Sequence, residues 1–284
     1  MKINVTRGFR LAISILCLTI LPLESVAQKL VILHTNDTHS QIEPLRVGRN
    51  KGTGGVERRL QFYDSQFKQY GADRVLVLDA GDFSQGTPYF TVGNGDLEVK
   101  LMNLLHTDVA TLGNHEFDNG VQEIARRIKD LAAFPVVCAN WSFEGTALEG
   151  LIKPYVIVGR GGFKIGIIGS TTTSLPAVCS PETIVGVKEL PTIPTVNSLA
   201  AMLKDEEHCD IVILLSHLGY MGGDYEHPSD RVLAANSRNI DIIVGGHSHT
   251  FLNKMIPIKN LDGKDVMITQ TGCTGVYVGK FEIF

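Results

Sequence analysis

Short, continuous apolar runs constrain the fold of this 284-residue chain most strongly. A run that is apolar at every position, rather than at alternate ones, is typical of a strand buried on both faces of its sheet. Segments with helical spacing of apolar residues lie between several runs, at 56–70, from 118 onward, and at 196–206. The predicted strands are 29–33, 74–78, 109–112, 135–138, 155–158, 164–168, 211–215, 240–244, 266–269 and 276–283.

This pattern predicts an α/β fold in which two mixed β-sheets pack as a sandwich with flanking helices. Gly159-Arg160-Gly161-Gly162 joins two predicted strands and indicates a hairpin turn. It does not resemble a phosphate-binding loop, because no Gly-Lys-Ser/Thr follows and no helix begins there. No repeat or Pro/Ser-rich linker divides the chain, so we expect residues 28–284 to form one domain.

The charge balance argues against a nucleic-acid polymer as partner. The formal net charge is −4 and the pI is near 6.1, so no basic surface is expected. An acidic protein that acts on an anionic substrate needs local positive charge, and a bound metal ion can supply it.

The first 27 residues are typical of a signal peptide. Basic residues precede an apolar stretch at 11–23, and Ser25-Val26-Ala27 offers a small-x-small cleavage site. The apolar stretch is short for a bilayer span, so we expect an exported protein, periplasmic or secreted, without a stable membrane span. An uncleaved membrane anchor is the alternative.

The cysteines are assigned no chemical role. Cys17 lies in the predicted signal peptide, which leaves Cys138, Cys179, Cys209 and Cys273. Export permits disulfides, but four cysteines allow three complete pairings and the sequence does not choose among them. Cys138 and Cys209 adjoin apolar runs and are expected in or near the core.

Polar side chains follow five of the predicted strands. Because the carboxyl ends of parallel strands meet at one edge of a sheet, we expect these side chains to converge. Imidazole mixed with carboxylate, without thiolate, favours zinc, manganese, iron or cobalt over calcium, and the set suits two ions that share one carboxylate. Taken singly, each motif also fits a turn or a helix cap, but turn chemistry has no need of four histidines. The candidate ligands are Asp37, His39, Asp82, Asn114, His217, His247 and His249.

His247 and His249 are separated by one residue at the end of a predicted strand. In an extended segment, residues i and i+2 point the same way, so the two imidazoles are predicted to project side by side.

Five strings carry a resemblance to a known family: ILHTNDTH, LDAGDFSQGTP, LGNHEFDNG, LLSHLG and GGHSHT. Their order resembles that of the calcineurin-like metallophosphoesterases, and the wider strings resemble the catalytic domain of 5′-nucleotidases. The resemblance extends from about residue 29 to 284. It implies the metallophosphoesterase fold and metal-dependent hydrolysis of phosphate esters.

The resemblance also implies roles for individual residues. Asp37, His39, Asp82 and His249 would bind one metal, and Asp82, Asn114, His217 and His247 the other. Asp82 would then bridge the two. His115 and Asp118 match the catalytic pair, and Asn114 and His115 would contact the substrate. Two adjacent divalent ions can supply a hydroxide nucleophile near neutral pH, and a neighbouring Asp118 favours the protonated form of His115.

The remaining motifs are assigned structural roles. His34 lies before the first candidate ligand and is predicted to point the opposite way. His106, His208 and His227 fall outside every matching motif and are expected at the surface or in turns. Gly54-Gly55 with Arg58 and Arg59 matches a family pattern, but we favour the start of a helix.

The sequence departs from the family at its end. Full-length 5′-nucleotidases carry a carboxy-terminal domain that binds the nucleobase, whereas this chain stops at VYVGKFEIF. Three interpretations stay open. One is the catalytic part of an exported 5′-nucleotidase with a separately encoded base-binding protein. Another is a stand-alone phosphoesterase that acts on cyclic nucleotides or nucleotide sugars. The third is a metal-binding, non-catalytic subunit, which the intact His115 and Asp118 argue against.

Overall fold

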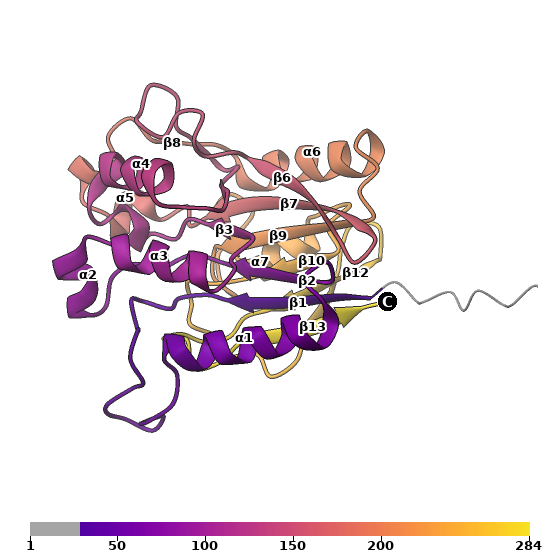
Figure 1. The fold of residues 1–284 in the computed structure, drawn as a ribbon. Helices are drawn as coiled ribbons and strands as arrows, with labels where there is room; N and C mark the ends of the chain where they lie inside the picture. Colours follow the sequence, from indigo (N-terminus) through magenta and orange to yellow (C-terminus); the bar gives the residue numbers. More distant parts are fainter. Residues whose placement is uncertain (1–28) are drawn as a thin grey trace, which may run out of the picture.

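The computed structural model describes residues 29–284, so the predicted signal peptide and Cys17 lie outside the described residues. Two mixed β-sheets pack face to face, and helices cover their outer faces (Figure 1). The predicted sandwich is confirmed. Among the described residues, no helix is both long and apolar enough to cross a membrane.

The first sheet has the order β13-β1-β2-β3-β4. Its parallel strands are β1 (Leu30–Thr35), β2 (Val75–Asp79), β3 (Val109–Thr111) and β4 (Val136–Val137). At its edge, β13 (Gly279–Ile283) pairs antiparallel with β1. The chain therefore returns to the first strand only at its last described residues.

The second sheet has the order β11-β12-β10-β9-β7-β6. Its strands are β6 (Tyr155–Arg160), β7 (Phe163–Thr171), β9 (Ile211–His217), β10 (Ile242–Val244), β11 (Ile256–Lys259) and β12 (Asp265–Thr269). The four inner strands are parallel, and the edge strands β6 and β11 are antiparallel to their neighbours. The predicted hairpin between β6 and β7 is confirmed. The sequence pattern did not predict β11, or a small sheet of β5 (Trp141–Ser142) and β8 (Lys188–Glu189).

Strand β1 shows why continuous apolar runs predict double burial. Leu30 and Ile32 pack in the core between the two sheets, whereas Val31 and Leu33 pack beneath helix α1 (Val56–Tyr70). All four side chains are fully buried. Burial of each stabilises the fold by roughly 1.5–3 kcal/mol relative to exposure, so both faces of this strand contribute.

The three predicted helices are present, with differences at their ends. α1 has the predicted bounds. α4 (Gly120–Asp130) begins after a 3-10 turn, η1 (His115–Phe117), rather than at Asp118. α6 (Thr192–Asp205) begins four residues before the predicted 196, because Pro194 is tolerated in a first helical turn, where its missing N–H is not needed.

Several short elements were not predicted because their apolar patterns are brief. They are α2 (Pro88–Gly93), α3 (Asp96–Leu104), α5 (Leu175–Val178), η2 (Pro181–Thr183) and α7 (Asp230–Ala235). α2 and α3 follow β2 and lie close to the loops at its carboxyl end (Figure 1).

Candidate metal centre

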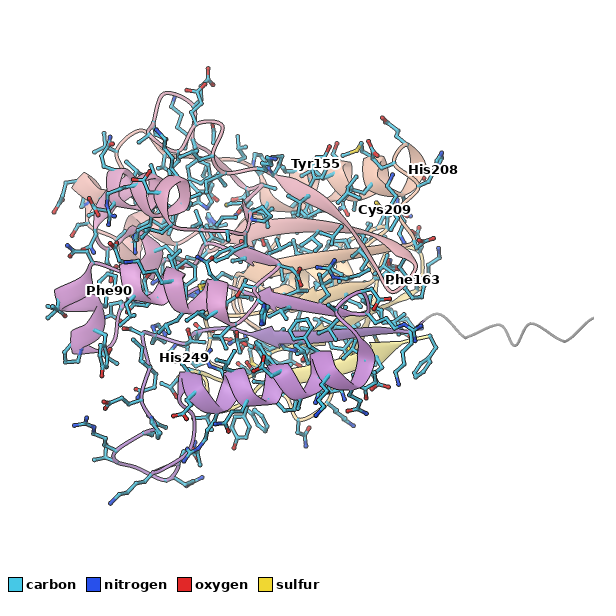
Figure 2. The ribbon with its side chains drawn as sticks, in the orientation of Figure 1. Phe90, Tyr155, Phe163, His208, Cys209 and His249 are labelled. Atoms are coloured by element: carbon cyan, nitrogen blue, oxygen red, sulfur yellow. The ribbon has the colours of Figure 1, made fainter. Side chains whose placement is uncertain are left out.

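The seven candidate ligands converge from five strand ends. Asp37 and His39 follow β1, Asp82 follows β2 and Asn114 follows β3; His217 ends β9, and His247 and His249 follow β10. Figure 2 shows His249 at this end of the molecule, with His208 and Cys209 at the opposite end. The first sheet thus supplies the carboxylates, and the second supplies three of the four imidazoles.

The donor atoms form two groups. In one, His249 Nε2 lies 3.3 Å from Asp37 Oδ1 and 2.9 Å from His39 Nε2. In the other, His217 Nε2 lies 3.0 Å from Asp82 Oδ2.

Two further contacts complete the arrangement, the first within the second group and the second between the groups. His247 Nδ1 lies 2.9 Å from Asn114 Oδ1, and His39 Nε2 is 3.9 Å from Asp82 Oδ2. Within each of two triplets, Asp37–His39–His249 and Asp82–His217–His247, the donor atoms lie within 4.8 Å of one another. Asp82 belongs to the second triplet and also forms a third one with His39 and His115, so it lies next to both groups.

The backbone of these loops is left-handed, which corrects the prediction for His247 and His249. Their φ angles are 73° and 52°, so the segment is not extended and the two rings do not project side by side. His247 faces Asn114, whereas His249 faces Asp37 and His39.

Other candidate ligands share this conformation. Asp37, His39 and Asp82 have φ angles of 49°, 48° and 54°. Such angles cost of order 1–3 kcal/mol per non-glycine residue and cluster at functional sites. The surrounding hydrogen bonds must therefore hold these loops in place.

His217 is oriented by a backbone carbonyl. Its Nδ1 lies 2.7 Å from the carbonyl oxygen of Ala80, so that nitrogen carries a hydrogen and, in the neutral ring, Nε2 directs its lone pair at the cluster. The ring is fully buried. This tautomer is the one that a metal-binding histidine requires.

Asp37 is held from two sides. Asn36 Nδ2 donates to its Oδ2 at 2.6 Å, and the backbone N–H of His247 donates to the same oxygen at 3.0 Å. The second contact ties the loop after β1 to the loop after β10. The candidate ligands of the two sheets are therefore linked directly.

The buried carboxylates need positive charge nearby. Burial lowers the pKa of His217, but Asp82 and Asp37 outweigh burial and raise it to about 10. Burial opposes ionisation of Asp82, yet the charge of His217 holds the pKa of that carboxyl below its usual range. Burial and then His217 lower the pKa of His247 to about 4, which keeps it neutral. The two carboxylates thus hold a proton on His217, and a divalent cation bound here would supply that positive charge in its place.

Glu116 has a role that the sequence analysis did not assign. Its carboxylate accepts backbone N–H bonds from Gly113 at 2.6 Å, Asp82 at 2.9 Å and Ser84 at 3.0 Å. It therefore ties the loop after β2 to the loop after β3. Burial raises the pKa of Glu116. Nothing in the local pattern signals this role, because all but one of its partners lie about 30 residues away.

His115 and Asp118 lie beside the cluster. His115 Nδ1 is 2.9 Å from Asp118 Oδ2, and this hydrogen bond raises the pKa of His115 although burial opposes it. The backbone N–H of His115 donates to Asp82 Oδ1 at 2.9 Å, and its ring centroid lies 5.3 Å from that of His39. About a third of each side chain is exposed, so a ligand in solution can reach both.

The other histidines take structural or surface positions. His34 is buried between the sheets with Nε2 3.2 Å from Thr269 Oγ1, and burial lowers its pKa to about 3. His106, His208 and His227 are exposed, as predicted.

All four cysteines in the described part of the chain are free thiols. Cys138 and Cys209 are buried, as predicted, whereas Cys179 and Cys273 are half-buried.

Comparison with known proteins identifies similar chains. The model of the calcineurin-like phosphoesterase family matches residues 30–251. Human 5′-nucleotidase is 34% identical over 281 residues, which is 90% of this chain and 46% of that protein. The chain therefore spans about half the length of the curated relatives that it matches.

Solved structures give the same result. The 5′-nucleotidase precursor of Thermus thermophilus matches with a TM-score of 0.78 and 34% identity, over 90% of this chain and 51% of that one. The NAD nucleotidase of Haemophilus influenzae matches with a TM-score of 0.76 and 29% identity, over 89% and 52%.

Proposed function

This chain belongs to the calcineurin-like phosphoesterase family, and from that premise we propose that it is a 5′-nucleotidase-like hydrolase of phosphate esters. The observation that carries the proposal is the convergence of seven oxygen and nitrogen donors from five strand ends. We propose two divalent ions, drawn from zinc, manganese, iron and cobalt. Asp37, His39, Asp82 and His249 would bind one, and Asp82, Asn114, His217 and His247 the other.

When bound, such a pair of ions supplies an activated water and neutralises phosphate charge. The protein's own residues supply positioning. His115 is proposed to face the phosphate through Nε2, since Nδ1 is engaged by Asp118. The hydrogen bond to Asp118 favours the protonated ring, which can stabilise charge on the phosphate or donate a proton to the leaving oxygen. Asn114 is proposed to contact the same phosphate.

Metal titration tests this proposal. The mature chain is stripped with chelator, titrated with Mn²⁺, Co²⁺ or Zn²⁺, and assayed with AMP, a cyclic nucleotide, a nucleotide sugar and p-nitrophenyl phosphate. We expect two ions per chain and activity that disappears with chelator. At most one tightly bound ion, with activity unaffected by chelator, contradicts it.

We further propose that base selectivity depends on residues beyond those described, such as a separately encoded base-binding protein. Binding energy remote from the phosphate helps to position the reacting group, and stacking side chains commonly supply it. Trp141, the only tryptophan, is buried within the small β5–β8 sheet and cannot stack on a base. We expect similar kcat/KM for AMP and p-nitrophenyl phosphate. A preference for AMP of about 100-fold or more contradicts this part.

We also propose export, supported by the order of basic, apolar and small residues at 1–27. Amino-terminal sequencing of the protein from the periplasm or medium is expected to begin near Gln28. Retention of the full-length chain in the cytoplasm contradicts export.

A further inference from the structure

The Gly54-Gly55 motif with Arg58 and Arg59 is only partly explained by the start of a helix. Gly55 does precede α1, with a φ of 93°, and a Cβ there would lie 3.1 Å from Pro44 Cδ. The two arginines differ, however. Arg58 is exposed and donates to the carbonyl of Gly54 at 3.2 Å, whereas only 8% of Arg59 is exposed.

Helical spacing turns Arg59 inward. The buried residues of α1 are Val56, Arg59, Tyr63 and Gln66, which form one face of the helix. A positive charge on a buried face is costly unless another group compensates it. Arg59 Nε is a buried atom without a hydrogen-bond partner among the described residues.

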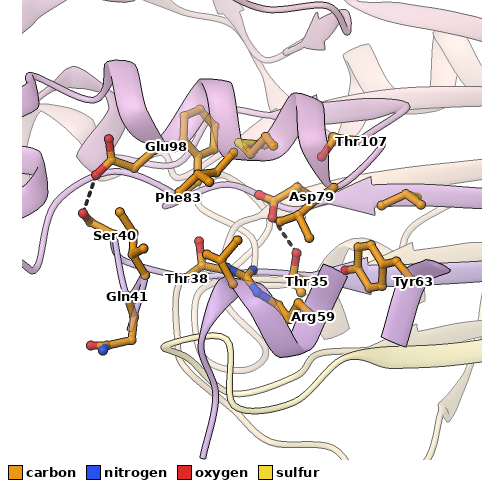
Figure 3. A pocket seen from close by; sticks show the side chains of 16 residues that line it. Thr35, Thr38, Ser40, Gln41, Arg59, Tyr63, Asp79, Phe83, Glu98 and Thr107 are labelled. Carbon is orange, nitrogen blue, oxygen red and sulfur yellow. Dashed lines mark hydrogen bonds between the residues drawn. The ribbon is translucent and has the colours of Figure 1, made fainter. Parts of the chain in front are cut away.

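Arg59 lines a small cavity whose wall includes Thr38 and Ser40, the two neighbours of His39. The cavity has a volume of about 30 Å³ and lies between α1, α3 and the strands β1 and β2. Figure 3 shows Arg59 reaching into it, with Asp79 and Glu98 among the side chains around it. Because one water needs roughly 10–15 Å³ by this measure, the cavity has room for about two.

Both carboxylates in this cavity hold a neighbour of a candidate ligand. Glu98 accepts a hydrogen bond from Ser40 Oγ, and Ser40 follows His39. Asp79 accepts one from the backbone N–H of Gly81 at 3.1 Å, and Gly81 precedes Asp82.

Glu98 is the carboxylate that lacks a partner. Asp79 uses both oxygens, because its second oxygen accepts from Thr35 Oγ1 at 2.7 Å. Glu98 Oε2 is buried and has no partner among the described residues. The other buried guanidinium close to Glu98, that of Arg127, already donates to Ser84 Oγ and to the carbonyl of Glu116.

We propose that Arg59 is a positioning residue for the metal centre, which it reaches through ordered water in this cavity and through Glu98. Two waters in the cavity, one that accepts from Arg59 Nε and one that donates to Glu98 Oε2, satisfy both atoms and link them. Glu98 then holds Ser40, and Ser40 holds the segment that carries His39. The proposal rests on the proposed function, because it requires that His39 binds an ion.

Mn²⁺ binding to the full mature chain tests this role. Arg59→Met removes the cation and keeps much of the side-chain volume, and Ser40→Ala cuts the link to Glu98 without changing a charge. Each variant is expected to lower the affinity for one of the two Mn²⁺ ions about tenfold or more, as is typical for groups that orient a metal ligand. The affected site is expected to be the one that His39→Ala empties. The affinity of the other site, which His247→Ala empties, is expected to change little.

Matched variants separate positioning from general loosening. Arg58→Met, on the exposed neighbour, is expected to bind both ions like the wild type. Arg59→Met/Glu98→Gln is expected to lose less affinity than the two single changes added together, because the two groups are coupled. Thermal unfolding checks that each variant folds.

Two results overturn the proposal. One is a folded Arg59→Met or Ser40→Ala protein that binds both Mn²⁺ ions as tightly as the wild type. The other is an equal loss of affinity for both ions. If Arg59→Met does not fold, Ser40→Ala decides alone. A wild-type chain that binds no Mn²⁺ pair contradicts the proposed function instead.

Discussion

Gly246 lies where an added methyl group would press directly on the candidate metal centre. A Cβ there would lie 2.7 Å from His217 Nδ1, 2.8 Å from the carbonyl oxygen of Ala80 and 3.2 Å from Asp37 Oδ2. The first two atoms are themselves hydrogen-bonded at 2.7 Å, so the methyl group would press against both ends of the bond that orients His217. Gly246→Ala is therefore expected to misplace His217 Nε2.

The size of the effect follows from these distances. Ordinary Cβ contacts begin near 3.4 Å, so His217 Nδ1 and the Ala80 carbonyl must move by about 0.7 Å and 0.6 Å, the differences from 2.7 Å and 2.8 Å. Metal sites require ligands within about 0.5 Å of their productive positions. The affinity for one ion is expected to fall about 10–100-fold, which corresponds to a loss of about 1.4–2.7 kcal/mol in binding free energy. Gly246 does not have a positive φ, so backbone strain does not add to this.

Calorimetric titration of the stripped protein with Mn²⁺ measures the effect. Gly159→Ala is the matched control, because Gly159 lies in β6 with nothing within 4 Å of the added Cβ. The control is expected to bind two ions like the wild type. If Gly246→Ala gives the same two affinities as the control, the contacts around His217 do not govern metal binding and the reasoning is wrong.

Three further predictions concern the proposed catalytic pair and a buried acid. His115→Ala is expected to keep both ions and lose about 10²-fold or more in kcat, whereas His247→Ala is expected to lose metal. Metal analysis and p-nitrophenyl phosphate kinetics measure both effects. If His115→Ala loses metal and His247→Ala does not, the assignments are wrong. Asp118 raises the pKa of His115, so the ring stays protonated at pH values above the ordinary pKa of histidine. Asp118→Asn is therefore expected to move the alkaline fall of kcat/KM to lower pH. An unchanged pH profile contradicts a protonated His115. Burial raises the pKa of Asp230 to about 7, so the folded state holds a proton that the unfolded state releases near pH 4. Stability from this group is therefore lost as pH rises from about 4 to 7, and Asp230→Asn is expected to flatten that slope in urea unfolding curves.

The local sequence pattern was sufficient to predict the sandwich, helix α1 and the residues that gather at the strand ends. Continuous apolar runs require burial on both faces, and parallel strands with helical crossovers bring their carboxyl ends together. The strand ends therefore allowed seven residues to be grouped from the sequence: Asp37, His39, Asp82, Asn114, His217, His247 and His249. The boundaries of α6 and the short elements α2 and α3 could not, since brief patterns compete with turn and proline effects.

The tertiary structure alone decided how these residues are aimed. His247 and His249 diverge because long-range hydrogen bonds hold their backbone left-handed, as in the bond from the His247 N–H to Asp37. Glu116 binds backbone groups about 30 residues away, and Arg59 shares a cavity with Asp79 and Glu98 only when α1 and α3 pack beside β1 and β2. The physical reason is that apolar periodicity reports which face of an element is buried. The partner of a buried charge depends on which other elements are packed against that face.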